Sequence, residues 1–269
     1  MSIKSVILKL FDDNRNYKTP NQAVNQASSL DSLSRDLYTD SKRFIYELLQ
    51  NADDSSISNS EVKVWIKIFG DKLVIAHSGK AFSARDLQGL CNVNNGTKRS
   101  DSTKTGYKGI GFKSVFGQSE NVTIYTDGEY FRFDSSYQFS WEWDNSQQVW
   151  EQENDRKFQF PWQIIPIYTE TEEVSDCIVE YIESISCNVS TIIKLSHLDA
   201  TRAAVEDLSQ NINMFLFLKN ISEIIFDIST QTCITINRDE SNRINLSQNS
   251  ALKANWLIHS LRMAVPRVN

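Results

Sequence analysis

Short segments rich in strand-forming residues and separated by turn dipeptides predict paired strands, and one of these segments alternates strictly between hydrophobic and polar positions. Residues 62–68 alternate in this way, and Gly70-Asp71 separates them from Lys72 and the apolar run 73–76. A second such pair, residues 122–125 and 130–133, flanks an Asp-Gly dipeptide. A period of two buries one face of a strand, and these dipeptides favour tight turns. We therefore predict two hairpins, and further strands near residues 191–195, 223–228 and 233–237.

Apolar residues three or four positions apart predict helices in other parts of the chain. The clearest helix carries Phe44, Ile45, Leu48, Leu49 and Ala52 on one face and ends in the polar stretch that starts at Asp53. Its candidate N-caps are Thr39, Asp40 and Ser41. Strands with intervening helices predict an α+β fold, a two-layer α/β sandwich. Other helices are expected at 22–37, 83–92, 202–218, 251–263 and, briefly, from Gly111, with an irregular insertion at 135–160.

Composition places the chain among ordinary globular proteins. Of 269 residues, 40% are hydrophobic and 23% are charged, and the net charge is −6. An acidic chain argues against dedicated binding to nucleic acid, which needs clustered Lys and Arg. Because no apolar run is long enough to cross a membrane and no secretory signal is visible, we expect a cytoplasmic location. Four widely spaced cysteines, with no CxxC pair, are expected to be free thiols.

Glu47, Asn51 and Asp54 stand at helical spacing beside an apolar face. At 100° per residue they fall within about 60° of the helix circumference. Polar side chains at the edge of a buried face need partners, and a bound cation or phosphate would provide them. Spacing alone is equally compatible with a helix flank whose acids are solvated.

The segment Gly106-Tyr107-Lys108-Gly109-Ile110-Gly111-Phe112-Lys113-Ser114 is a second candidate. Glycines let backbone N–H groups approach an anion closely, and a following helix points its positive end at that anion. A Walker A loop would need Lys directly after the last Gly, where Phe112 stands. A Rossmann fingerprint would need Gly at Ser114. By itself the cluster is as typical of a plain tight turn. Residues 94–108 before it are almost free of apolar side chains, which indicates a mobile loop.

Taken in order, the motifs resemble the GHKL superfamily of ATPases. The sequence Glu47-Leu-Leu-Gln-Asn-Ala-Asp-Asp54 precedes a hairpin strand that ends in His77-Ser-Gly-Lys-Ala-Phe82, and Gly106-xx-Gly109-x-Gly111-Phe112 follows. The residues of these motifs are most similar to those of the sacsin and NO VEIN type. That type also has a Gly-Thr-Lys in its lid, which here is Gly96-Thr97-Lys98. The resemblance spans about residues 35–235.

The resemblance implies a Bergerat fold, with a mixed, mostly antiparallel sheet, helices on one face, a mobile lid, and ATP and Mg²⁺ as cofactors. Glu47 matches the catalytic general base and Asn51 matches the ligand of Mg²⁺. Other positions match the family's nucleotide contacts. The expected ATP-binding residues are Asn51, Asp54, His77, Gly79, Phe82, Lys98, Gly106, Gly109, Gly111, Phe112, Lys113 and Thr191.

His77 departs from the pattern, because much of the superfamily has an Asp there that accepts the adenine amino group. A neutral imidazole can also accept, so ATP affinity would fall as pH drops through the histidine range near 6.5. A buried core histidine is the alternative. Also missing is a cation that reaches the γ-phosphate from a following domain, so hydrolysis is expected to be slow.

The implied organisation is an ATP-binding domain at 1–240, with core motifs at 38–195, and a C-terminal helical extension at 241–269 that leads into further domains. Lid closure would drive conformational change or association in a larger chaperone-like or bacterial defence protein. Expected partners are ATP and further domains or proteins, including a nucleotide-dependent dimer, with neither nucleic acid nor membrane. The alternative is a nucleotide-binding scaffold module that does not hydrolyse ATP.

Overall fold

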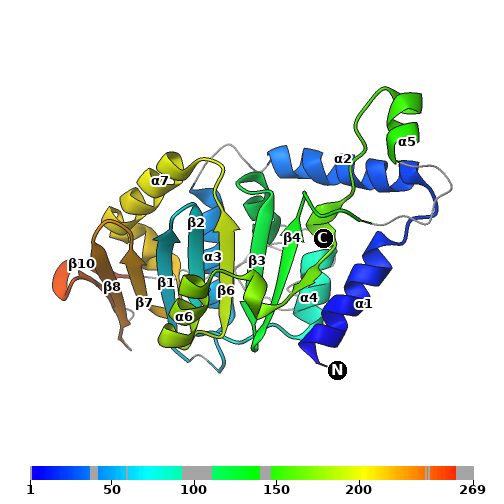
Figure 1. The fold of residues 1–269 in the computed structure, drawn as a ribbon. Coiled ribbons are helices and arrows are strands. Elements are labelled where there is room, and N and C mark those ends of the chain that lie inside the picture. The colour runs from blue at the N-terminus through cyan, green and yellow to red at the C-terminus, as the bar shows by residue number, and fades with distance from the viewer. Residues whose placement is uncertain are drawn as a thin grey trace, which may run out of the picture.

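The computed structural model describes residues 2–36, 42–58, 60–92, 111–139, 147–239, 241 and 243–258. Within these ranges the chain forms one mixed sheet of ten strands in the order β10-β9-β8-β7-β1-β2-β6-β3-β4-β5, with helices packed on it (Figure 1). Among the pairs described, β1 and β7 are parallel and all others are antiparallel. The predicted α+β sandwich with a mostly antiparallel mixed sheet is therefore confirmed.

The elements have the following bounds. The strands are β1 (Val62–Phe69), β2 (Lys72–His77), β3 (Asn121–Thr126), β4 (Glu129–Asp134), β5 (Ile167–Thr169), β6 (Val189–Lys194), β7 (Ile221–Asp227), β8 (Gln231–Arg238), β9 (Arg243–Gln248) and β10 (Ala251–Leu257). The α-helices are α1 (Ile3–Arg15), α2 (Pro20–Asp36), α3 (Arg43–Asp54), α4 (Ala84–Cys91), α5 (Gln147–Asn154), α6 (Asp176–Ile185) and α7 (Leu198–Gln210). The 3₁₀ turns are η2 (Gly111–Gly117), η3 (Trp162–Ile164), η4 (Thr171–Glu173) and η5 (Ile212–Phe217).

Both predicted hairpins form. In the turn between β3 and β4, Asp127 has φ 52° and Gly128 has φ 81°. Positive φ at both central residues is typical of the tight turn that matches the twist of two antiparallel strands. The cysteines also behave as expected, since all four are free thiols, with Cys91 and Cys187 buried.

Two cores cover opposite faces of the sheet. The larger one joins the sheet to α1, α3, α4 and α7 and includes Phe44, Leu49 and Val205. The smaller one packs Ile178 and Ile182 of α6 onto the other face (Figure 1). Helices therefore lie mainly on one face, as expected, with α6 as an addition on the other. No described helix has the length and apolar character to span a membrane.

Four sequence expectations differ from the structure or fall outside it. The helix expected at 251–263 is wrong over residues 251–257, which form the edge strand β10 because Asn249 and Ser250 make a turn at φ 48° and 66°. The helix expected at 202–218 is divided into α7 and η5. The insertion at 135–160 contains α5. The candidate caps Thr39, Asp40 and Ser41 lie outside the described residues, and Lys42 precedes α3 without a side-chain cap.

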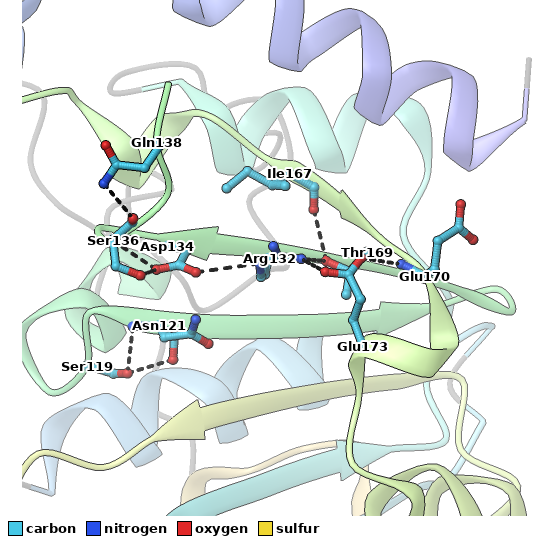
Figure 2. A network of polar contacts seen from close by, with 10 residues as sticks. All are labelled: Ser119, Asn121, Arg132, Asp134, Ser136, Gln138, Ile167, Thr169, Glu170 and Glu173. Carbon is cyan, nitrogen blue, oxygen red and sulfur yellow. Dashed lines mark hydrogen bonds and ion pairs between the residues drawn. The ribbon is translucent and has the colours of Figure 1, made fainter. Parts of the chain in front are cut away.

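A polar network fixes the short edge strand β5 to β4 (Figure 2). Arg132 Nη1 donates to Thr169 Oγ1 at 3.0 Å and to Glu173 Oε2 at 2.9 Å, while its Nε lies 3.5 Å from Asp134 Oδ2. Arg132 follows the buried Phe131 in β4, so it points to the sheet face opposite α3. The network contains none of the predicted site residues, and its arginine is already paired.

The carboxylate of Asp53, at the end of α3, holds the start of β7. Asp53 is only 2% exposed, and its Oδ1 accepts hydrogen bonds from the backbone N–H groups of Asn220 (2.7 Å) and Ile221 (2.9 Å). Its Oδ2 accepts from Lys219 N at 3.0 Å. A buried charge is tolerated when several donors satisfy it, and backbone donors need no side-chain ordering. The contact therefore ties the helix to the strand that pairs in parallel with β1.

Asp53→Ala is expected to lower the free energy of unfolding by about 2–3 kcal/mol, because three backbone N–H groups, including that of the buried Ile221, lose their acceptor. Asp53→Asn should cost less, since one oxygen can still serve Asn220 and Ile221. Urea denaturation measures both, with Asp12→Ala as the control, because that exposed carboxylate pairs with Arg15 on the helix surface. Equal stability of Asp53→Ala and Asp12→Ala would contradict this role.

Candidate functional site

The glycine motif and the polar flank of α3 meet at one close contact. A Cβ added to Gly111 would lie 2.0 Å from Glu47 Oε2. No residue with a side chain fits there unless the carboxylate moves. Glu47 and Asn51 are both partly exposed and lie beside the helix face that carries the buried Phe44, Leu48 and Ala52. Glu47 and Gly111, 64 positions apart in the chain, are thus in direct contact.

The loop after β2 packs against the end of the same helix. A Cβ on Gly79 would lie 1.8 Å from Ser55 Oγ and 3.1 Å from His77 Nδ1. Lys80 N donates to Ser55 O at 2.8 Å, which brings the loop onto the residue that ends α3. Asn188 then fixes the loop from the other side, because its Nδ2 donates to Ser78 O at 2.9 Å and to Gly79 O at 3.0 Å.

His77 lies at the end of β2 on the face of the sheet that α3 covers. It is 7% exposed, and its Nδ1 lies 3.4 Å from Ser55 Oγ. Burial lowers the pKa of His77 to about 4. The imidazole is therefore neutral throughout the physiological range and keeps an acceptor nitrogen. The expected loss of affinity near pH 6.5 is not supported, since the titration lies well below it.

Thr191 and Phe82 approach the same region from other elements. Thr191 pairs with Ile75 in the register between β2 and β6, so its side chain shares a sheet face with Ile75 and His77. Thr191 is 5% exposed. Phe82 packs partly against the main core, and its backbone N–H donates to Thr126 Oγ1 at 2.9 Å. Both residues therefore border the sheet side of the site.

The structure places the other predicted residues as follows. Asp54 lies on α3, partly exposed, one turn beyond Asn51. Phe112 is buried in the core beside Gly111. The Lys113 ammonium points inward and donates to the carbonyl oxygens of Leu90 (2.8 Å) and Gln163 (3.5 Å). Lys98, Gly106, Gly109 and the predicted loop 94–108 lie outside the described residues.

Three residues of this region were not found from the sequence: Ser55, Thr126 and Asn188. Each acts through a hydrogen bond or contact with a segment far from it in the chain. Ser55 follows the helix motif directly, so a C-cap position was its only sequence signal. Thr126 and Asn188 stand at strand ends and have no distinctive spacing.

A separate hollow of about 340 Å³ opens beneath the end of α7, lined by residues such as Glu206, Asp207, Phe226 and Thr232. None of the predicted site residues lines it. Among the described residues, no cluster of three or more His, Cys, Asp or Glu side chains is arranged to hold a metal ion.

We expect the parent protein to lose stability as pH falls from 7 to 5, in part because of His77. The folded-state pKa of about 4 lies below the unfolded value of 6.5. Between these values the unfolded chain binds more protons, so the free energy of unfolding rises with pH and falls on acidification. The His77 contribution is about 2 kcal/mol over this interval. Urea denaturation at pH 7 and pH 5 should show a smaller loss for His77→Gln than for the parent, and equal losses would contradict burial of a neutral imidazole.

The two close glycines should differ in their tolerance of a methyl group. At Gly111 the obstacle is the end of a flexible glutamate side chain, so Gly111→Ala should displace the carboxylate and change the free energy of unfolding by less than about 1 kcal/mol. At Gly79 the added Cβ also meets Ser55 Cβ at 2.9 Å, and overpacking of about 1–3 kcal/mol is expected. Urea denaturation of both variants checks the ranking, which the reverse order would refute.

Comparison with known proteins finds similarity to segments of two very long proteins. The chain is 36% identical over 109 residues to Protein NO VEIN of Arabidopsis thaliana, a match that covers 40% of this chain and 4% of that protein. It is 33% identical over 92 residues to sacsin of Homo sapiens, covering 29% of this chain and 2% of sacsin. No protein-family model matches the chain. The chain thus spans only a few per cent of the length of these relatives and is related in sequence to segments of sacsin and NO VEIN.

Proposed function

We propose that this chain is a GHKL-type domain that binds ATP with Mg²⁺ and hydrolyses it. The observation that carries the proposal is the contact between Gly111 and the Glu47 carboxylate. It joins a potential general base to a glycine-rich segment whose backbone N–H groups suit phosphate oxygens. The sequence similarity to sacsin and NO VEIN segments supports the same assignment.

Glu47 is the proposed general base of this reaction. Its carboxylate is partly exposed and directly adjoins the glycine segment, so a water molecule that it orients would lie beside the proposed phosphate site. Proton abstraction by a positioned carboxylate contributes about 10²–10⁴-fold to a hydrolysis rate. The chain's remaining task is to position and neutralise the phosphates, which dominates catalysis of phosphoryl transfer.

The base of the nucleotide is proposed to lie near the end of α3. His77 offers a neutral acceptor nitrogen there, and Asp54 and Thr191 add polar groups from the helix and from β6. Gly79 lets the loop pass close to the helix end, and Asn188 fixes the loop carbonyls. An adenine amino group is a donor, so the acceptor atoms on this side suit it.

The residues present fit a magnesium ion that the nucleotide itself helps to hold. Mg²⁺ prefers oxygen ligands and commonly takes only one or two from the protein, with the rest from phosphates and water. The amide oxygen of Asn51, one turn from Glu47 on α3, is such a ligand. When bound, the ion would neutralise phosphate charge, which the acidic Glu47 beside it does not do.

We further propose that hydrolysis by this chain alone is slow and that the domain works within a larger protein. In much of the superfamily a following domain supplies a cation to the γ-phosphate, and no such Lys or Arg was recognised in this sequence. A lost charge of that kind costs several orders of magnitude in rate. The related segments in NO VEIN and sacsin are small parts of long chains. Nucleotide-dependent changes in contacts with neighbouring domains or proteins are the proposed output.

Glu47→Gln is expected to abolish phosphate release and to leave Mg·ATP affinity nearly unchanged, because it removes only the proton acceptor. Asn51→Ala should instead weaken Mg·ATP binding by about tenfold or more, since it removes the metal ligand. Calorimetry and a phosphate-release assay measure these effects. Gln50→Ala is the matched control for Asn51→Ala, because it removes an amide from the neighbouring position, about 100° from Asn51 around the helix.

The outcomes separate the alternatives. Absence of ATP binding by the parent would refute the proposed function as a whole. Binding without measurable turnover would indicate a nucleotide-binding scaffold module. A turnover that Glu47→Gln leaves unchanged would refute Glu47 as the general base.

A further inference from the structure

Lys113 is a fully buried lysine inside the glycine-rich motif. The residue is 1% exposed, and burial lowers the pKa of its ammonium to about 8. Its Nζ donates to Leu90 O at 2.8 Å and to Gln163 O at 3.5 Å, and it lies 5.8 Å from the centre of the Phe116 ring. The ammonium therefore faces the end of α4 and the turn η3.

The acceptors of Lys113 belong to two segments, the last turn of α4 and the turn η3. Leu90 lies in the last turn of α4, where carbonyls lack partners within the helix and the helix dipole is negative. A cation is favoured at that position. Gln163 belongs to η3 and is also buried, and its Nε2 donates to Asp31 of α2 at 2.8 Å.

Asn14 of α1 makes a parallel bridge between the same two segments. Its Nδ2 donates to Cys91 O at 3.4 Å and to Ile164 O at 2.6 Å, which are the next residues along from Leu90 and Gln163. The α4 end and η3 are thus joined twice, once from α1 and once from η2. The bridge from Lys113 differs because it also attaches η2, and with it Gly111, to the end of α4 and to η3.

We propose that Lys113 is a positioning residue: its ammonium anchors η2 to the ends of α4 and η3 and so holds Gly111 against the Glu47 carboxylate. This inference rests on the proposed function, in which that contact forms the catalytic site, and it replaces the expected direct contact between Lys113 and ATP. Lys113 stands two residues after Gly111, on the same 3₁₀ turn that packs on α3, so a shift of its anchor would move the glycine.

A lysine suits this task better than an apolar residue of similar length, although it is costly to bury. A methionine would fill the space but would leave the carbonyls of Leu90 and Gln163 without this donor. Holding the charge away from water opposes folding, as the lowered pKa of Lys113 indicates. The neighbouring Cys91 does not balance that charge, because burial raises the pKa of its thiol to about 12. The expected benefit is therefore positional rather than stabilising.

The test compares Lys113→Met, Lys113→Arg and the control Asn14→Leu, which removes the parallel bridge and leaves the link to η2. Without nucleotide, hydrogen exchange over residues 111–117 should accelerate in Lys113→Met and stay near the parent value in Asn14→Leu. With Mg·ATP, kcat should fall on the order of 10–100-fold in Lys113→Met, since a displacement of about 1 Å can cost that much. Lys113→Arg keeps the charge and should retain more activity, although its larger head group should make it the least stable.

A merely structural role would make activity follow stability, whereas positioning predicts opposite rankings: Arg above Met in kcat, and Met above Arg in the midpoint of urea denaturation. Unchanged exchange over residues 111–117 in Lys113→Met, or equal acceleration in Asn14→Leu, would overturn the inference. If the parent neither binds nor hydrolyses ATP, the proposed function fails, and the exchange comparison without nucleotide still decides whether Lys113 anchors η2.

Discussion

A single buried carboxylate, that of Asp53, fixes how the central helix sits on the sheet. Its two oxygens accept hydrogen bonds from three successive backbone N–H groups, at residues 219–221, and the Asn220 side chain donates back to Asp53 O at 2.9 Å. Arg238 adds a bond to Ile221 O at 2.9 Å. The end of α3 is thereby locked to the start of β7, and β7 is the parallel neighbour of β1.

These hydrogen bonds set the position of the polar flank of α3, on which the candidate site is built. With the C-terminus of the helix fixed by Asp53, its next residues contact the loop after β2, where Ser55 meets Gly79 and His77. Two turns earlier, Glu47 meets Gly111. The helix therefore presents one edge to two loops at once, and small residues in both loops allow the close approach.

The candidate site and its surroundings contain buried charged groups, whose removal from water costs free energy, and a buried neutral imidazole, for which this cost is small. Asp53 is satisfied by backbone donors, and His77 avoids the cost of a buried charge by remaining neutral. Lys113 keeps a proton at neutral pH in a buried position, with carbonyl oxygens as its partners. Polar groups of this kind confine the surrounding elements to one arrangement, because any displacement leaves a buried donor or acceptor unpaired.

The amino-acid sequence by itself determined the elements with strong local signals. The hairpins β1–β2 and β3–β4 follow from alternation and turn residues, and α3 follows from its apolar face, because local geometry alone controls both patterns. The spacing of Glu47, Asn51 and Asp54 on one helix edge was also readable. The motif order indicated the relationship to sacsin and NO VEIN segments that the comparisons support.

Only the tertiary structure decided the features that depend on distant partners. Residues 251–257 became an edge strand rather than a helix because a tight turn returns them to β9, and their weak apolar pattern gave no sign of it. Asn188 and Ser55 entered the site through contacts with a loop far away in the chain. The inward direction of Lys113 and the low pKa of His77 arise from burial. Burial and long-range hydrogen bonding depend on which segments meet in space, and no local pattern in the sequence encodes that.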